Sequence, residues 1–495
     1  MSQPVGRATL AREMGVLGLT ATGVCAMVGA GINIIPFMIQ RNVPGIGPYV
    51  LPAFLFAALP AMLAGLAYAI LASAMPRAGG SYVYASRGLS PYLGFVASFS
   101  QWFALCVAIG VVSYVLVPFI RDIAIAANWP QAASILDRGP VRLTISLGVL
   151  WAAVIANLRG IVFYQRLVVP LMFLTFALGA VVIVAGFWFD AGDFSAALIA
   201  REGRGVPEVP STFAPWTFMS ASAVLFASFI GFDAIAQAGG EAKQPGRTMP
   251  LAIGLAVGSV ALFYLMFTAA VYNAVPWQYV ADEAARRDLT APGLLGYLLP
   301  PFWTVVIVSA AAVALAKDLP AMLLATSRLM FAWAEDGIFP RAVAAVHPRR
   351  RTPHIAVLAS GAMATLGVLG SHLAGDFFLG VDILVTAMLV NFLLMAVSVL
   401  TLPGRNPAIA RDITVLPNPA HRVPLALLAV IVIAGFFAVH TIKDLTAPAA
   451  AWYFRSTWLW LAVMTAGTII YWRETAGLKA AGVDLRARFA ALPPE

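Results

Sequence analysis

Twelve separate runs of mostly apolar residues, of about 16 to 34 residues each, constrain the fold of this chain more than any other feature. A helix rises 1.5 Å per residue, so it needs about 20 apolar residues to cross a hydrocarbon layer of about 30 Å. Outer-membrane barrels are instead built from strands of about ten residues with alternating polarity, and the sequence has no such pattern. We therefore predict an all-α polytopic membrane protein with 12 transmembrane helices, near 16–40, 48–74, 91–120, 142–159, 166–188, 213–238, 249–274, 300–333, 355–371, 379–402, 423–442 and 457–472.

The composition agrees with this prediction and excludes a soluble protein. Hydrophobic residues make up 61% of the 495 residues and charged residues 11%, and the mean hydropathy is +0.88. Soluble domains contain about 45–50% apolar and about 25% charged residues. The longest loop, 189–212, is too short for a separate domain, so the function must lie within the helices.

The net charge of +9 does not indicate a nucleic-acid partner. The basic residues are scattered between the apolar runs and do not cluster with aromatic residues on one face. The two cysteines, Cys25 and Cys106, lie inside apolar runs, where a thiol acts as a small buried hydrophobic group. We expect a small-molecule substrate and a lipid bilayer as partners, no nucleic acid, no cofactor and no metal.

Lysine and arginine are distributed unevenly between the loops. If the N-terminus is cytoplasmic, 20 of the 31 lie in inside segments, 10 lie in outside segments, and Lys317 falls within a run. Cytoplasmic loops carry such an excess of positive charge. An even number of spans places both termini on one side, so 1–15 and 473–495 are predicted to be cytoplasmic tails. We expect a plasma membrane, specifically a bacterial inner membrane.

Glycines near the middle of runs 1 and 6 predict that these two helices are broken. Run 1 contains Gly29 and Gly31 with Asn33 beside them, and run 6 contains Gly231 followed by Asp233. Each pair alone is also typical of close helix packing. Runs 1 and 6 would hold matching positions if runs 1–5 and 6–10 were inverted repeats, and paired interruptions of this kind indicate a transporter's binding site. Broken helices expose N–H groups to an anion and carbonyl groups to a cation, which suits a zwitterion.

Four segments of the sequence resemble the amino acid-polyamine-organocation superfamily of secondary transporters. They keep the order and spacing of that superfamily over most of the chain. They are 29–32 (GAGI), 75–84 (MPRAGGSYVY), 229–233 (FIGFD) with 241–245 (EAKQP) and Pro250, and 325–328 (ATSR) with 335–340 (EDGIFP).

The resemblance implies a LeuT-type fold, in which helices 1 and 6 are broken at the midplane. One inverted repeat would cover 16–188 and the second 213–402, with two peripheral helices at 423–472. The cytoplasmic segments 76–84 and 328–340 would belong to the inner gate and would not contact substrate. The implied binding groups are the N–H groups of Gly29, Ala30 and Gly31 for a carboxylate, and the carbonyl groups of Ala227, Ser228 and Ile230 for an ammonium.

The sequence departs from the superfamily pattern at three places. An acidic residue that usually precedes the end of span 2 is replaced by Ile70, and a usual pair of glutamates after span 6 is reduced to Gly240 and Glu241. The lysine that several proton-coupled members carry in span 5 is absent, with Thr175 near the matching position. Coupling through that particular lysine is therefore not expected.

Ionisable residues inside the apolar runs are candidates for function, because each costs about 2.5–3.5 kcal/mol at the bilayer centre. Lys317 lies near the span 8 position that binds the cation in sodium-coupled relatives. Its ammonium could replace sodium and release and regain a proton, which predicts proton coupling in preference to sodium coupling. The alternative is a structural role, either in a salt bridge to Asp233 or Asp382 or with the side chain reaching into a polar cavity.

Asp318 and Asp233 are further candidates for coupling. Adjacent helical residues point about 100° apart, so we expect Lys317 and Asp318 to serve different contacts. Asp318 either faces the cavity, where it favours a cationic group, or caps a break made by Pro320. Asp233 is expected to order the unwound part of span 6.

The function predicted from these features is amino acid transport by alternating access. Residues flanking the breaks are pocket candidates by position, although methionine and phenylalanine in helices often pack in the core. A largely apolar lining favours neutral or hydrophobic amino acids. The alternative is an exchanger of amines or basic amino acids, with Asp318 or Asp233 as the counter-charge. The pocket candidates are Cys25, Met27, Cys106 and Phe226.

Two other classes of function are less consistent with the sequence. A membrane enzyme needs clustered nucleophiles, metal ligands or acid–base pairs. The five histidines lie in loops or at the ends of runs, and no nucleophile-elbow or phosphate-loop pattern occurs in the sequence. A sensor or scaffold with the same fold is the second of these classes, but the sequence contains no appended signalling domain.

Overall fold

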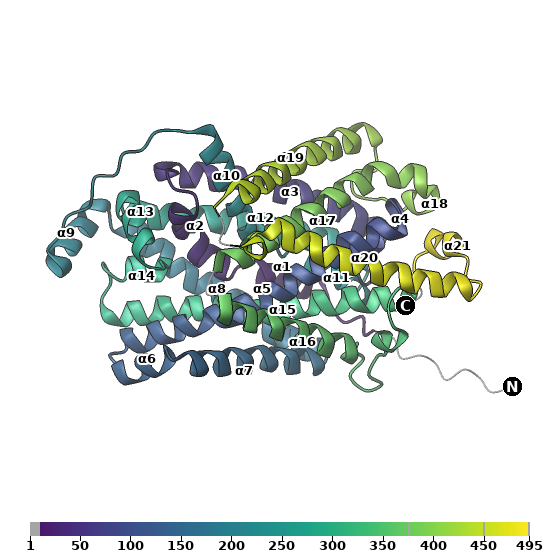
Figure 1. Ribbon diagram of the computed structural model, residues 1–495, viewed down its shortest axis with the longest axis horizontal. Coiled ribbons are helices and arrows are strands. Elements are labelled where there is room, and N and C mark those ends of the chain that lie inside the picture. The colour runs from purple at the N-terminus through teal and green to yellow at the C-terminus, as the bar shows by residue number, and fades with distance from the viewer. Residues whose placement is uncertain (1–9, 375–376, 449–450, 494–495) are drawn as a thin grey trace.

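Helices form almost all regular structure in the computed structural model, which describes residues 10–374, 377–448 and 451–493. Within these ranges there is no β-strand, and the β pairing consists of two isolated bridges, Met14 with Ala242 and Ala78 with Ala238. The axes of the long helices lie side by side and roughly along the long axis of the molecule (Figure 1).

The helices follow one another along the described chain with short connections. The first half contains α1 (Val16–Met27), α2 (Ala30–Asn42), η1 (Gly47–Tyr49), α3 (Val50–Ala74), α4 (Gly80–Gly88), α5 (Pro91–Ala126), α6 (Pro130–Leu136), α7 (Gly139–Leu158), α8 (Ile161–Trp188), α9 (Ala191–Glu202), α10 (Pro215–Leu225), η2 (Phe226–Phe229) and α11 (Ala234–Gln237). The second half contains η3 (Gly239–Glu241), α12 (Pro245–Ala274), α13 (Trp277–Arg286), α14 (Ala291–Leu295), α15 (Pro301–Asp336), η4 (Arg341–Ala344), α16 (His354–Ala374), α17 (Phe377–Arg405), α18 (Pro407–Ala410), α19 (Pro419–Thr446), η5 (Trp452–Phe454), α20 (Ser456–Ala480) and α21 (Leu485–Ala490).

Eleven helical segments of the described chain are long and apolar enough to cross a membrane. They coincide with the first eleven predicted runs, and most of the helices extend a few residues beyond the predicted ends, as α5 and α19 do. A helix also forms at the twelfth run, but α20 contains tryptophans, threonines and Arg473 and is less apolar than the other eleven. The structure is thus that of an all-helical polytopic membrane protein, with eleven spans identified by length and apolarity.

The first and sixth spans are both interrupted, as their glycines predict. In the first span, α1 ends at Met27 and α2 begins at Ala30, and Val28 has an extended conformation with φ −85° and ψ 90°. In the sixth span, η2 is followed by Ile230 with φ −75° and ψ 138°, and then by Gly231 with φ +136°. A residue with a side chain rarely adopts that conformation, so the second break depends on glycine.

Glycines also allow the two breaks to touch each other. A Cβ atom on Gly231 would lie 2.4 Å from the carbonyl oxygen of Ala26, at the end of α1. A Cβ atom on Gly31 would lie 3.1 Å from Cα of Ser228. The backbones of the first and sixth spans therefore approach more closely than side chains at these positions would permit.

The interrupted spans lie at the centre of the bundle. In the most apolar stretch of the first span 94% of residues are buried, and in the sixth 89%, compared with 28% in the fifth. α1 contacts α8, α12 and α15, while α5 packs against α15, α16 and α17. The polar backbone of the breaks is thus separated from lipid by protein, which is the condition under which irregular backbone is tolerated inside a membrane.

Different short helices lie at the two ends of the bundle. One end holds α6, α9, α13 and α14, and the other holds α18 and α21 (Figure 1). At the second end, Arg488 Nη1 donates to the carbonyl oxygen of Asp336 at 3.0 Å. Met14 pairs with Ala242, next to the Glu241 that forms an ion pair with α15. Both described ends of the chain therefore pack near the C-terminal part of α15.

The predicted long loop, 189–212, contains the short helix α9 and is fastened to α13 by charged groups. Arg204 Nη2 lies 2.7 Å from Glu283 Oε2 and Arg204 Nη1 lies 3.4 Å from Asp282 Oδ2. Burial raises the pKa of Glu283, but hydrogen bonds from Arg204 and Arg287 outweigh this effect, so its pKa lies below the ordinary value. This end of the bundle is thus covered by an ordered segment.

We expect Gly231→Ala to lower the thermal stability of the protein. Alanine at this φ is strained by about 1–3 kcal/mol, and its Cβ would collide with the carbonyl oxygen of Ala26. Gly258→Ala is the matched control, because a Cβ at Gly258 on α12 would have no atom within 4 Å. Thermal unfolding of both purified variants in detergent tests this prediction, and equal midpoints for the two would contradict it.

Candidate functional site

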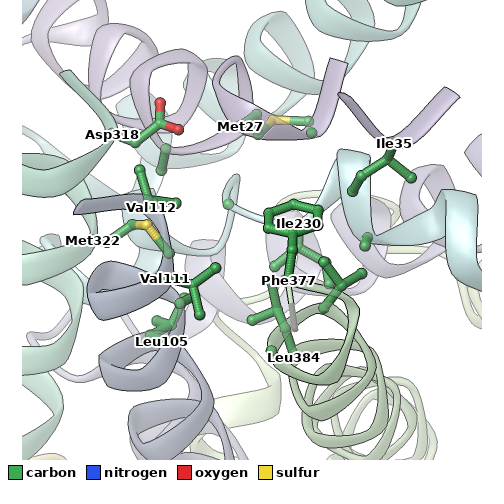
Figure 2. A pocket seen from close by; sticks show the side chains of 17 residues that line it. Met27, Ile35, Leu105, Val111, Val112, Ile230, Asp318, Met322, Phe377 and Leu384 are labelled. Atoms are coloured by element: carbon green, nitrogen blue, oxygen red, sulfur yellow. The ribbon is translucent and has the colours of Figure 1, made fainter. Parts of the chain in front are cut away.

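A cavity lies beside the two helix breaks. It contains about 610 Å³ of space free of atoms, including the part that is open to solvent, and it is bounded by the two interrupted spans, α5, α15 and α17. Asp318 is the single ionisable residue among the described residues that line it, and every other lining residue is apolar or glycine. Figure 2 shows the larger side chains around this space: Met27, Ile35, Leu105, Val111, Val112, Ile230, Asp318, Met322, Phe377 and Leu384.

Side chains from other helices bind the carbonyl groups at the end of α1. Lys317 Nζ donates a short hydrogen bond to the carbonyl oxygen of Val28 and lies 3.4 Å from that of Cys25. Tyr264 Oη, from α12, donates to the carbonyl oxygen of Met27 at 2.5 Å. The last carbonyl groups of a helix have no intrahelical partner. These side chains therefore supply hydrogen bonds that the broken helix cannot form.

The start of α2 faces the carboxylate of Asp318. A Cβ atom on Gly29 would lie only 1.5 Å from Asp318 Oδ2, so the carboxylate occupies space that glycine leaves free. The carbonyl oxygen of Gly29 accepts a hydrogen bond of 3.0 Å from Asn33 Nδ2. The first N–H groups of α2, including those of Ala30 and Gly31, lack intrahelical acceptors, and a helix N-terminus attracts negative charge.

Lys317 and Asp318 serve different contacts, with Lys317 on carbonyl groups at the end of α1 and Asp318 on the cavity wall, but they also contact each other, which was not expected. Lys317 Nζ lies 3.4 Å from Asp318 Oδ1, and both side chains are buried. The flexible lysine side chain bends over the 100° that separates the two Cβ directions. The helix α15 continues through Pro320, so Asp318 caps no break there. The ion-pair partner of Lys317 is Asp318 and neither Asp233 nor Asp382.

Asp233 contacts the backbone of the second break and is not among the described residues that line the cavity. Its Oδ1 accepts a hydrogen bond of 3.2 Å from the N–H group of Gly231, and its Oδ2 accepts a short one from Gln101 Nε2. The side chain is fully buried. These contacts fit the predicted role of Asp233 in ordering the unwound part of the sixth span.

Ser228 carries a buried hydroxyl group next to the start of α2. The residue is 1% exposed, and its Oγ has no hydrogen-bond partner among the described residues. Its Oγ lies 3.4 Å from the position of a Cβ on Gly31. An unsatisfied buried hydroxyl group costs free energy, so a bound polar ligand at this place would be stabilised.

The cavity includes some of the residues that the sequence predicts. Met27, Gly31, Ala227, Ile230 and Asp318 line it. Gly29 and Ala30, which precede Gly31, form the junction between the break and α2.

Three pocket candidates point elsewhere. Cys25 Sγ donates to the carbonyl oxygen of Val168 on α8 at 3.4 Å. Cys106 is buried on the part of α5 that lies against α16. The ring of Phe226 packs against Phe392, with centroids 6.0 Å apart. These positions were chosen by depth along the helix, and depth does not determine which face of a helix a residue occupies.

Several residues of the lining were not predicted from the sequence. Met322 follows Asp318 by four residues on α15, so helical spacing alone could have identified it. Leu105, Ala108 and Val112 form one face of α5, next to Cys106, which is not among the described lining residues. Nothing in the sequence indicated that the first two turns of α17 line the cavity. Their contribution to the lining depends on how distant helices pack together.

Buried ion pairs hold the end of the bundle near the described chain ends. Arg328 Nη2 lies 2.5 Å from Glu241 Oε1, and Arg87 Nη1 lies 2.6 Å from Asp336 Oδ2, which also accepts from Tyr82 Oη at 2.8 Å. Burial lowers the pKa of Arg87, but hydrogen bonds and the charge of Asp336 raise it above its ordinary value. None of the described residues in 76–84 or 328–340 lines the cavity.

We expect Gly29→Ala to destabilise the protein through the Asp318 carboxylate. The three atoms nearest to the added Cβ all belong to that carboxyl group. The double variant Gly29→Ala with Asp318→Ala should therefore lose less stability than the sum of the two single variants. Thermal unfolding of the four proteins of this cycle measures the coupling. Strictly additive losses would contradict the contact.

Comparison with known proteins finds a matching family profile and several similar transporters. The sequence profile described as amino acid permease matches residues 14–468. The branched-chain amino acid permease of Bacillus subtilis (strain 168) is 26% identical over 422 residues, which cover 82% of this chain and 84% of that protein. The methylthioribose transporter of the same organism is 24% identical over 94% of this chain and 93% of its own length. The mouse cationic amino acid transporter 4 is 27% identical over 72% of this chain, and the match spans 55% of its length.

These findings confirm the superfamily resemblance and point to a transporter of small molecules in a membrane rather than to an enzyme. The chain belongs to the amino acid permease family.

Proposed function

We propose that this protein is a secondary active transporter of neutral or hydrophobic amino acids that works by alternating access. The observation that carries the proposal is the cavity at the two helix breaks, where exposed backbone groups meet an apolar lining. Discontinuous helices at matching positions are typical of transporters that bind substrate between two repeats. A branched-chain amino acid permease among the relatives supports the substrate class.

The proposed architecture is the LeuT-type fold with 12 transmembrane helices. The repeats would cover 16–188 and 213–402, with peripheral helices at 423–472. The eleven spans and the breaks in the first and sixth support this division. The bias of lysine and arginine supports cytoplasmic tails at 1–15 and 473–495 in a bacterial plasma membrane.

In the proposed substrate pose, the first break binds the carboxylate of the substrate and the second break binds its ammonium. The carboxylate would accept hydrogen bonds at the start of α2, where helix N–H groups lack intrahelical acceptors and Ser228 Oγ lacks a partner among the described residues. The side chain would fill the apolar space between α5 and α17. The ammonium would bind carbonyl groups in the sixth span. The backbone groups concerned are those of Gly29, Ala30 and Gly31 for the carboxylate, and of Ala227, Ser228 and Ile230 for the ammonium.

We place proton coupling at the Lys317–Asp318 pair. The ammonium of Lys317 occupies carbonyl groups at the end of α1 that would otherwise be available to a metal cation. This occupation disfavours sodium as the coupling ion. The pair is buried next to the cavity, so substrate binding and protonation can influence each other.

The alternative function is the exchange of amines or basic amino acids. The carboxylate of Asp318 in the cavity favours it, because a cationic group would be attracted there. Cationic amino acid transporters also occur among the relatives. The same uptake measurement separates the alternatives when leucine is compared with arginine and with simple amines.

We expect purified protein in liposomes to accumulate radiolabelled leucine when an inward proton gradient is imposed. Lys317→Ala should abolish stimulation by the gradient while leucine still binds, because the charge balance of the coupling pair is lost. Lys443→Ala is the matched control, since Lys443 lies on α19 and donates to Asn42 Oδ1 at 2.8 Å, away from the cavity.

Leucine uptake by the wild type that does not depend on the proton gradient would contradict proton coupling. Uptake of arginine or amines in preference to leucine would support the alternative substrate class. Absence of uptake for all of these compounds would contradict the proposed function as a whole.

A further inference from the structure

The carboxylate of Asp318 lies where the carboxylate of an amino acid is proposed to bind. It contacts the backbone at Gly29, immediately before α2, and it faces the cavity (Figure 2). The residue is only 4% exposed. A carboxylate-bearing substrate that enters this site must therefore approach another carboxylate in a buried environment.

We propose that Asp318 takes up the coupling proton when substrate binds, so that Asp318 and the substrate carboxylate share one proton at the start of α2. This inference rests on the proposed function, because it assumes that an amino acid binds here through its carboxylate. It identifies which member of the Lys317–Asp318 pair carries the transported proton.

The charges around the site explain why a proton would be taken up when substrate binds. Without substrate, the ammonium of Lys317 and the carboxylate of Asp318 balance each other at 3.4 Å. A second carboxylate would bring two negative charges together beside the ammonium of Lys317 in an almost fully buried site, while the substrate's own ammonium is proposed to bind at the other break. Two carboxylates that share such a site cannot both ionise without a large cost, and one proton binds to the pair. The proton comes from the solution on the side to which the cavity opens, and it leaves after substrate departs on the other side.

Protonated Asp318 would also be able to donate a hydrogen bond to the substrate carboxylate. An ionised carboxylate only accepts, whereas a protonated carboxyl group can donate to the oxygen of a neighbouring carboxylate. The Ser228 hydroxyl group, unpartnered among the described residues, is a second donor beside Gly31. The substrate carboxylate would then replace the Asp318 carboxylate as the negative partner of Lys317.

Lys317 is suited to remain an ammonium in this arrangement. An ammonium has three N–H donors and no acceptor. The atoms that face Lys317 Nζ are the carbonyl oxygens of Val28 and Cys25 and the Oδ1 atom of Asp318. Three acceptors therefore match three donors, and a neutral amine would leave one acceptor without a donor.

Few other titratable groups of the described chain face Asp318. Cys25 from α1 and Tyr264 from α12 interact with its charge, in addition to Lys317 from α15 itself. The thiol of Cys25 donates to Val168 and the hydroxyl of Tyr264 donates to Met27, so both protons are already engaged. The described cavity residues on α5 and α17 are apolar or glycine.

Titration calorimetry on the purified full-length protein tests this inference. Leucine binding is measured at pH 7 in several buffers with different enthalpies of ionisation, and the dependence of the heat on the buffer gives the number of protons taken up. We expect about one proton per bound leucine in the wild type. In Asp318→Asn, leucine should bind with almost no proton uptake. 3-Methylbutan-1-amine, which resembles leucine without its carboxylate, should cause no proton uptake in either protein.

Asp382→Asn is the matched control. This carboxylate lies on α17, 3.8 Å from Lys443 Nζ, and does not line the cavity, so proton uptake should be unchanged. Leucine binding to the wild type without proton uptake, or equal uptake in Asp318→Asn, would overturn the inference and leave the proposed function intact. Absence of binding by any amino acid would overturn both. If Asp318→Asn does not fold, the comparison of leucine with the amine on the wild type decides, because equal proton uptake for the two would overturn the inference.

Discussion

The free backbone groups at the two helix breaks are the feature on which the rest of this structure depends. Inside a membrane, each carbonyl or N–H group that leaves a helix must find a partner within the protein. At the end of α1 the partners are the ammonium of Lys317 and the hydroxyl of Tyr264. At the second break the carboxylate of Asp233 binds the N–H group of Gly231. Helices α5, α8, α12 and α15 surround these polar contacts and separate them from lipid.

The same arrangement explains why we place the proposed binding site here. A broken helix keeps some backbone groups available for a ligand, and the surrounding helices supply an apolar space next to them. The lining contains one ionisable side chain among the described residues, so in the proposed site a ligand would be distinguished by a few polar contacts at one end and by shape at the other. Asp318 lies at the boundary between these two parts, in contact with both Gly29 and Lys317. In the proposed binding mode, this position would link the charge of the ligand to the charge of the protein.

The features that sequence predicted well are those with a strong local signal. Apolar runs long enough to cross a membrane identified the spans, and glycines at matching positions identified both breaks. At the second break the signal has a clear cause, because few other residues permit a φ such as that of Gly231. The direction of individual side chains was predicted less well. A residue chosen only by depth can lie on the wrong face of its helix, as Cys106 does beside Leu105. The contact between Lys317 and Asp318 depends on a flexible side chain, and the contribution of α17 depends on packing between distant segments.

Protection of the cavity by substrate is the most direct test of the claim that the two breaks form the binding site. Val381→Cys, made in a background with Cys25→Ser and Cys106→Ser, places one thiol on the cavity wall. Its rate of modification by a small maleimide is compared with that of Gly205→Cys, in the exposed loop after α9. The account predicts that leucine slows modification at position 381 and leaves position 205 unchanged. Equal modification rates at position 381 with and without a leucine concentration that saturates uptake would contradict it.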